Sequence, residues 1–484
     1  MQARFEFDNS YAQDLQGLYV PWQGQNWPDP QIVILNETLA AELGLDPAAL
    51  KSAEGVAMLS GHALPESARP LAQAYAGHQF GGFSPQLGDG RAILVGEILD
   101  PQGARRDLHL KGSGRTPFAR GGDGRAVLGP VLREYLISEA MAALGVPTTR
   151  ALAACTTGDR VLRQNGLEPG AVLARIAASH LRVGTFQFFA ARGEADKLRL
   201  LLDYALARHD PDLVGTRDAA LAFLDRVARR QAELVAQWMG IGFVHGVMNT
   251  DNTTISGETI DYGPCAFMDR YDPATVFSSI DQTGRYCYAN QPTIAQWNLA
   301  RLAEALLPLI DESETKAIEK ATGVIEAMAE SYRSAWLAVF ARKLALPAPD
   351  PALIESLHEL WQGRNVDFTS FFRALPDALR GRDETVLALF SDPSGVRDWL
   401  ARWRALIPDP ETASARIEAV NPLYIPRNHM VDEALHAASF ENDLTLFRSL
   451  LARVQSPFSA AEGMEHYAAP APVDAPEIVT FCGT

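Results

Sequence analysis

The chain has 484 residues, 47% of them hydrophobic and 21% charged. This is the composition of an ordinary globular protein, which excludes a disordered, collagen-like or coiled-coil chain. The 59 acidic and 43 basic residues give a net charge of −16, which repels polyanions unless basic side chains gather locally, so we expect no nucleic-acid partner.

The cysteine content and the start of the chain bear on its compartment. No CxxC pair or His/Cys spacing suited to zinc occurs, so neither a disulfide scaffold nor a structural zinc site is expected. The first residues lack a basic region followed by an apolar one, and no apolar run reaches ~18 residues. We therefore expect a cytoplasmic protein with no membrane partner. The cysteines are Cys155, Cys265, Cys287 and Cys482.

Four regions follow one another along the chain. Residues 1–70 read as an N-terminal extension that packs on the core. Residues 71–190 are strand-rich, with strands expected over 92–99, 105–111, 150–157 and 160–179, and with one helix that starts at Pro130 and ends before Gly145. Residues 191–460 have helical periodicity, clearest over 216–240, 293–310 and 314–344. Residues 461–484 look like a flexible tail that carries Cys482. This order predicts an α+β fold with two lobes and a cleft between them.

A glycine turn precedes the first of these strands. Gly88 and Gly90 would let the backbone approach a phosphate, and Arg91 would add a guanidinium that can bind it. Asp-Gly is also a common hairpin signal, so a plain turn is the alternative.

Lys111 closes the strand 105–111, and a helix carrying Glu134 and Glu139 follows it. In kinases a glycine-rich loop covers the phosphates, a strand lysine binds them, and a glutamate on the next helix pairs with that lysine. The two glutamates lie about 140° apart around a helix, so at most one of them can face Lys111.

The segment HGVMNTDN, from His245 to Asn252, has the spacing of a kinase catalytic loop, in which His and Asn are seven residues apart. Val247 stands where that loop has its catalytic Asp, and a different carboxylate, Asp251, precedes the Asn. Ordinary phosphorylation of hydroxyls is thereby put in doubt. A short strand expected over 253–260 leads to Asp261-Tyr262-Gly263, where kinases have their metal-binding D-F-G. Asn252 and Asp261 together offer the oxygen ligands that Mg²⁺ prefers.

Arginines gather around His180. Arg175 and Arg182 bracket this histidine, and in an acidic protein they either pair with carboxylates or clamp a polyphosphate, of which the second is favoured by their place just after the strand-rich region. We expect His180 and His78 to be structural, and Cys155 and Cys265 to be buried thiols.

Six separated blocks together resemble the selenoprotein O family of pseudokinases: AYAGHQFGGFSPQLGDGRA, HLKGSGRTPFARGGDGRA, VLREYLISEAM, SHLRVGTF, HGVMNTDNT and DYGP. The resemblance covers most of the chain. It implies a protein-kinase-like fold, with a β-rich N-lobe, a helical C-lobe and a helical C-terminal elaboration. It also implies a protein adenylyltransferase that transfers AMP from ATP to Ser, Thr or Tyr hydroxyls, and UMP as well, with the nucleotide flipped relative to kinases.

The resemblance also implies a role for each site residue. Asp251 would accept the proton, Lys111 would pair with Glu134, and Asn252 and Asp261 would bind Mg²⁺ or Mn²⁺. The residues expected to contact ATP are Gly88, Gly90, Arg91, Lys111, Asp123, Gly124, Arg175, Arg182 and Asp261. The terminal Cys-Gly-Thr resembles the family's redox tail, with Cys482 in the selenocysteine position and Cys265 or Cys287 as its possible partner.

Two other functions stay open at this point. A kinase-like phosphotransferase would transfer the γ-phosphate of ATP. A non-catalytic ATP-binding scaffold would act through its partners or through Cys482. In each case ATP and proteins are the expected partners.

Overall fold

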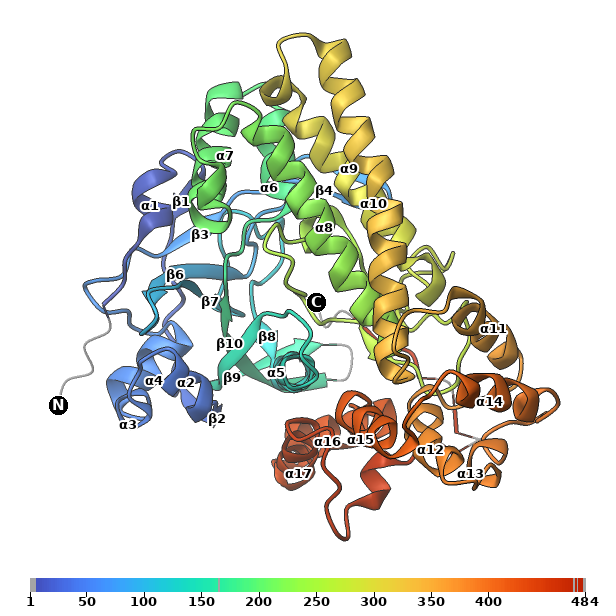
Figure 1. Ribbon diagram of the computed structural model, residues 1–484. Coiled ribbons are helices and arrows are strands. Elements are labelled where there is room, and N and C mark those ends of the chain that lie inside the picture. The colour runs from blue at the N-terminus through green and yellow to red at the C-terminus, as the bar shows by residue number, and fades with distance from the viewer. Residues whose placement is uncertain (1–5, 164–165, 473–474, 477, 482–484) are drawn as a thin grey trace.

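The computed structural model describes residues 6–163, 166–472, 475–476 and 478–481, and it has an α+β fold. Its main sheet has eight strands, all antiparallel to their neighbours, in the order β1-β3-β6-β7-β10-β9-β2, with β8 paired to β10 (Figure 1). The strands of this sheet are β1 (Tyr19–Pro21), β2 (Gln31–Leu35), β3 (Leu71–Gln73), β6 (Ala92–Leu99), β7 (Arg105–Lys111), β8 (Ala126–Val127), β9 (Arg150–Arg163) and β10 (Gly166–Ala177). Two small ribbons pair β4 (Gly77–Gln79) with β5 (Gly82–Ser84), and β11 (Phe243–Val244) with β12 (Ala266–Phe267).

Helices cover both faces of the sheet and build most of the chain beyond it. Apart from short turns, they are α1 (Ser10–Asp14), α2 (Glu37–Glu42), α3 (Pro47–Leu50), α4 (Ala53–Ser60), α5 (Leu128–Ala143), α6 (Val183–Ala190), α7 (Ala195–His209), α8 (Ala219–Gly240), α9 (Gln291–Ile310), α10 (Glu314–Lys343), α11 (Pro351–Trp361), α12 (Phe368–Leu379), α13 (Glu384–Leu387), α14 (Val396–Ala405), α15 (Pro410–Val420), α16 (Asn428–His436) and α17 (Thr445–Val454). In the described part of the chain, none of these helices is both long and apolar enough to cross a bilayer.

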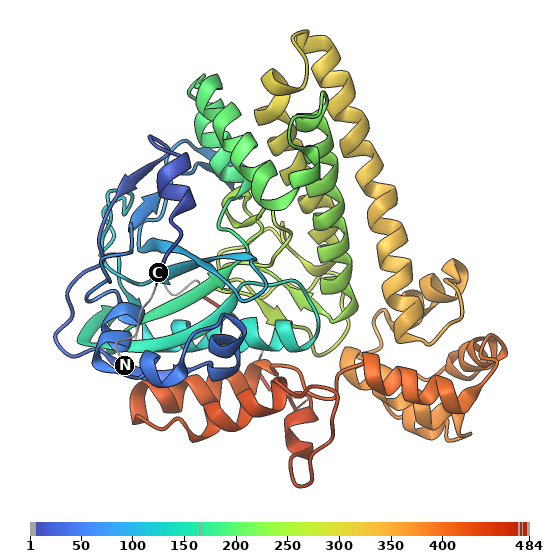
Figure 2. The same cartoon turned by 60° about the vertical axis from the view of Figure 1, so that its left-hand side comes forward.

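The sheet separates two hydrophobic cores. On one face, α2 to α4 pack on side chains such as Val95 and Leu110. On the other face, α5, α16 and α17 pack on Ala154 and Leu173, so helices from near the C-terminus lie under the sheet (Figure 2). A third core joins the long helices α8, α9 and α10. Strand β6 is buried along almost its whole length, which is typical of a strand covered on both faces.

Residues 1–70 contribute to the sheet itself. Strand β1 pairs with β3 at one edge, and β2 pairs with β9 at the other. The apolar run 32–35 therefore lies within an edge strand.

Three expectations differ from the structure. The segment 160–179, expected as one strand, is divided: its first residues complete β9, which ends at Arg163, and β10 begins at Gly166. Helix α5 begins at Leu128, before Pro130, because a proline in the first helical turn removes an amide that has no partner there anyway. The prediction of a strand over 253–260 was wrong. This segment makes only isolated bridges, from Thr254 to Arg182 and from Thr259 to Thr148, because a turn at Gly257, with φ of +80°, interrupts the extended chain.

The segment 478–481 docks beside the loop that follows Asp261. The amide of Thr480 donates to the Phe277 carbonyl at 2.8 Å, and its hydroxyl donates to the Pro264 carbonyl at 2.6 Å. Cys155 and Cys265 are buried free thiols, as expected, and Cys287 is partly exposed. Cys482, expected as a redox residue, lies outside the described residues.

Candidate active site

Five charged side chains meet where β7, β10, α5 and the loop after β11 converge. Lys111, the last residue of β7, places Nζ 2.6 Å from Glu134 Oε2 and 2.6 Å from Asp261 Oδ1. Arg175 on β10 places Nη1 3.0 Å from Glu134 Oε1 and 2.7 Å from Asp261 Oδ1. Arg182, just before α6, has Nη2 3.8 Å from Asp261 Oδ2. Residues separated by up to 150 positions thus share one network.

The cations dominate the electrostatics of Asp261. Burial acts to raise the pKa of this carboxyl, but Lys111, Arg175 and Arg182 hold it well below its ordinary value. Asp261 also has a left-handed backbone, with φ of 61°, a strained conformation that tends to occur at functional sites. Glu139 faces elsewhere and binds Arg150 at 2.8 Å.

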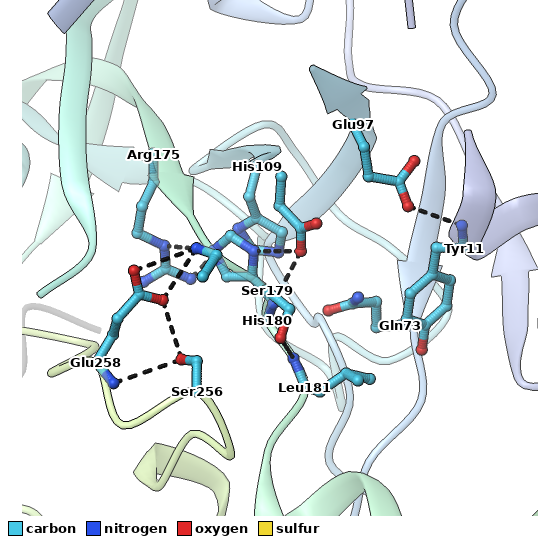
Figure 3. Close-up of polar contacts among 12 residues, drawn as sticks. Tyr11, Gln73, Glu97, His109, Arg175, Ser179, His180, Leu181, Ser256 and Glu258 are labelled. Carbon is cyan, nitrogen blue, oxygen red and sulfur yellow. Dashed lines mark hydrogen bonds and ion pairs between the residues drawn. The ribbon is translucent and has the colours of Figure 1, made fainter. Parts of the chain in front are cut away.

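Two stacked histidines contact the Arg175 guanidinium through nitrogens other than the one that binds Glu134 and Asp261 (Figure 3). Its Nε lies 3.2 Å from His180 Nε2, and its Nη2 lies 3.3 Å from His109 Nδ1. The other nitrogen of His180, Nδ1, lies 2.9 Å from Asp107, and the other nitrogen of His109, Nε2, lies 3.2 Å from Asp89. Arginine can only donate, so each ring accepts from Arg175 and donates to its carboxylate. Arg175 is therefore fixed on three sides.

Asp251 lies in the short helical turn η2 (Thr250–Asn252) and keeps one carboxylate oxygen without a hydrogen bond. Its Oδ2 accepts from Gln79 Nε2 at 3.2 Å, whereas its buried Oδ1 has no partner. A methyl group at Gly77 would lie 2.5 Å from Oδ1, so only glycine fits at that point of the β4–β5 hairpin. Burial raises the pKa of Asp251 to about 6, against the opposing effect of Arg182.

The loop around Asp251 is tied to the segment that carries Asp261. The Nε2 atom of His245 lies 2.9 Å from the Ile260 carbonyl, and Asn252 Nδ2 donates to the Val247 carbonyl at 3.0 Å. Val247 is a buried apolar residue. The loop that carries Asp251 is thereby linked to the residue that precedes Asp261.

A cavity of about 710 Å³ opens beside Lys111 and Glu134. Arg91 lines it too, and its carbonyl accepts from the Gly112 amide at 2.7 Å, which places the turn 88–91 next to the end of β7. Gly88 has φ of 77°, and a methyl group there would lie 2.4 Å from the Phe118 ring, so this turn requires glycine.

The other expected loop lies further from the network. Asp123 is 47% exposed and pairs with Arg163, at 2.8 Å, rather than with the cations around Asp261. Gly124, with φ of 72°, packs against the backbone of Arg115. Arg163 lines the same cavity as Arg91, so the side chain that binds Asp123 borders that cavity.

The donor atoms near Asp261 suit a hard divalent cation. In the described part of the chain no three His, Cys, Asp or Glu side chains gather as a metal cluster, so Asn252 and Asp261 could supply only two oxygens. Mg²⁺ commonly binds one or two protein oxygens together with substrate phosphates and water. The amide oxygen of Asn252 and the carboxylate of Asp261 are oxygen donors of the kind that such a metal uses.

Several site residues were not expected from the sequence. Asp107, His109 and Lys111 alternate along β7, and residues at a spacing of two share one face of a strand; that alternation is the signal that could have found His109. Gln79 and Tyr75, whose ring lies 4.4 Å from the Arg182 guanidinium, carry no comparable signal. His180, expected to be structural, touches Arg175 directly.

Known proteins match this chain along almost its whole length. A family described as "Protein adenylyltransferase SelO" matches residues 2–455. The chain belongs to the SelO family. It is 58% identical to a protein nucleotidyltransferase YdiU of Cereibacter sphaeroides, over 99% of this chain and 100% of that one. A YdiU of Mycobacterium sp. (strain KMS) is 54% identical, over 99% of each chain, and one of Rhizobium leguminosarum bv. trifolii is 54% identical, over 100% of this chain and 98% of that one. As a SelO family member, the chain is a nucleotidyltransferase.

Proposed function

We propose that this enzyme transfers AMP from ATP to Ser, Thr or Tyr hydroxyls of proteins, with Asp251 as the proton acceptor. The observation that carries the proposal is the buried, unbonded Oδ1 of Asp251 beside Asn252, in a loop where Val247 replaces the usual catalytic Asp. The family description supports the same chemistry.

In the proposed step, the acceptor hydroxyl oxygen forms a bond to the α-phosphorus of ATP, and the bond from that phosphorus to the bridging oxygen of pyrophosphate breaks. The hydroxyl proton passes to the carboxylate of Asp251, and pyrophosphate leaves with the bond electrons. Gln79 holds the other oxygen of Asp251, which orients the carboxylate.

The cations of the site would stabilise the phosphates. Lys111 and Arg175 both bind Glu134 and Asp261, so a phosphate would compete with these carboxylates for either cation. Arg182 makes the longer pair, with Nη2 3.8 Å from Asp261 Oδ2. We propose that ATP contacts Gly88, Gly90, Arg91, Lys111, Asp123, Gly124, Arg175, Arg182 and Asp261.

Asn252 and Asp261 would hold Mg²⁺ or Mn²⁺, which when bound supplies positive charge to the phosphate oxygens. We also propose a kinase-like arrangement of two lobes. The pairing of a strand lysine with a helix glutamate, here Lys111 with Glu134, supports it, as does the link between His245 and the segment before Asp261.

The test uses ATP labelled separately at the α- and γ-phosphates, with UTP labelled at its α-phosphate in parallel. We expect protein-bound label from the α position and none from the γ position. Asp251→Asn should lower the rate at least about 100-fold, the range general-base catalysis contributes. Asp212→Asn, at an exposed ion pair, is the control and should keep the wild-type rate.

The other outcomes separate the alternatives. Label from the γ position alone would show a kinase-like phosphotransferase. ATP binding without transfer to any protein would favour the non-catalytic scaffold.

A further inference from the structure

A group of exposed and partly exposed aromatic and arginine side chains lies beside Asp251. Phe80 and Phe83, on the β4–β5 hairpin, are 37% and 42% exposed. Next to them lie Trp297 and Arg301 on α9, and Arg285 in the loop before that helix. We call these five residues the acceptor patch.

The hairpin is fixed to the catalytic loop by three consecutive residues. The His78 amide donates to Thr250 Oγ1 at 2.7 Å, and the Phe80 amide donates to Asn249 Oδ1 at 3.2 Å. Between them, Gln79 binds Asp251 at 3.2 Å. The two phenylalanines are therefore held at a constant position relative to the catalytic carboxylate.

Arg285 lies against the same hairpin. A methyl group at Gly81 would lie 3.6 Å from the guanidinium carbon of Arg285. Gly81 is two residues from Gln79, a distance of at most about 7 Å along the chain. A polypeptide whose hydroxyl lies at Asp251 can thus reach Arg285 with a neighbouring side chain.

Arg285 contacts the nearby carboxylate of Asp281 through its backbone amide and not through its guanidinium. Asp281, four residues away, uses its two oxygens on the amides of Arg285 and Tyr286, at 2.9 and 2.8 Å. The buried Nε of Arg285 has no hydrogen-bond partner, and its guanidinium makes no ion pair with any residue that the structure describes.

A second arginine adds to the positive potential of the acceptor patch. The guanidinium groups of Arg285 and Arg301 each lie 4.9 Å from the centre of the Trp297 ring. Glu304 pairs with Arg301 at 2.8 Å, so Arg285 is the arginine of the acceptor patch whose guanidinium has no carboxylate within ion-pair distance among the described residues. A guanidinium without a carboxylate partner can form a charge-assisted hydrogen bond with a carboxylate of a bound polypeptide.

We propose that the acceptor patch binds the acceptor polypeptide and selects a segment that carries a carboxylate side chain one or two residues from the modified hydroxyl, with Arg285 as its ion-pair partner. Phe80 and Phe83 cover the apolar part of the same segment. This inference rests on the proposed transfer of AMP to protein hydroxyls, and it adds the class of sequence that is accepted.

The test uses three synthetic peptides with one Ser acceptor, identical except that the residues flanking it are Glu, Gln or Lys. With α-labelled ATP, the wild-type enzyme should have kcat/KM about tenfold higher for the Glu peptide than for the Gln peptide, through KM, as expected for one charge-assisted contact. R285Q should reduce this ratio to about one, and R285E should favour the Lys peptide. Arg333, an exposed arginine on α10 that pairs with Glu355, provides the control R333Q, which should keep the wild-type ratio.

Binding of a fluorescent ATP analogue, measured for every variant, checks that the nucleotide site is folded. Equal labelling of the Glu and Gln peptides by the wild-type enzyme would overturn the inference and leave the proposed function intact. So would labelling of proteins but of none of the peptides. Absence of label from every peptide and every protein would instead contradict the proposed function.

Discussion

Arg175 shows how a single side chain in this site depends on its neighbours. His109 and His180 stack with their ring centres 4.2 Å apart, and burial lowers the pKa of both, that of His180 to about 3. Both rings are therefore neutral, which lets each of them accept a hydrogen bond from Arg175. A protonated ring would have no acceptor to offer and would repel the guanidinium.

For a single residue of the site, we expect His180→Leu to lower kcat/KM for ATP about tenfold, because the Nε atom of Arg175 loses its acceptor and the guanidinium is no longer held in place. His180→Gln, which can restore an acceptor, should recover part of the loss. His209→Gln serves as the control, since this partly buried histidine binds Ser179 at 2.8 Å rather than the arginine. A purely structural role for His180 would lower the melting temperature of His180→Leu and leave kcat/KM of the folded enzyme unchanged.

Helix α10 carries a buried lysine near its C-terminal end. Lys343 is 4% exposed, and its Nζ lies 3.9 Å from the centre of the Phe372 ring. Burial lowers its pKa to about 7. The folded chain consequently binds fewer protons than the unfolded chain between pH ~7 and ~10.4, so the free energy of unfolding rises with pH in this window.

At the scale of this helix we expect Lys343→Met to raise the free energy of unfolding by about 2 kcal/mol at pH 7, because it removes a buried amine that must otherwise lose its proton or its hydration. The variant should also lose part of the increase in stability between pH 7 and pH 10. Urea unfolding across this range measures both effects. Lys320→Met, at an exposed position of the same helix, should keep the wild-type pH dependence. If the free energy of unfolding of Lys343→Met changes with pH in parallel with the wild type, the lowered pKa of Lys343 is contradicted.

Across the whole molecule, Arg427 joins segments that are far apart in the sequence. This residue is 1% exposed and binds Asp269 at 2.5 Å and Asp367 at 2.7 Å, as well as the Ala468 carbonyl at 2.9 Å. It connects the start of α16 with the start of α12 and with the segment after β12. The C-terminal helices are thereby attached to the part of the chain that carries Asp261.

Replacing Arg427 by Met should lower the free energy of unfolding by about 3–5 kcal/mol, because two carboxylates lose their buried partner. Adding Asp367→Asn should recover part of this loss, since the amide is uncharged and can still cap α12 at the Ser370 amide, now 2.7 Å away. Arg397→Met, at an exposed pair with Glu384, should change stability by less than about 1 kcal/mol. Denaturant unfolding compares the four proteins, and a small effect of Arg427→Met would refute the role of this arginine.

Local patterns were sufficient for much of the secondary structure. The bounds of β6 and β7 follow from runs of strand-forming residues, and the helices α8, α9 and α10 follow from the periodicity of their apolar residues. Both signals come from residues close together in the sequence. The expected strand before Asp261 failed because Gly257 forms a turn within it. Helix α5 starts earlier than Pro130 indicates.

The sequence by itself determined which residue types are available: a lysine at the end of a strand, a glutamate on the next helix, Val247 in place of an aspartate, and the order of the six family blocks. Only the tertiary structure decided which of them meet. Three contacts join residues more than 60 positions apart: β2 pairs with β9, Gln79 binds Asp251, and His109 binds Arg175. His180 is close to Arg175 in the sequence as well. Such contacts depend on packing of the whole chain, and local sequence preferences do not encode them.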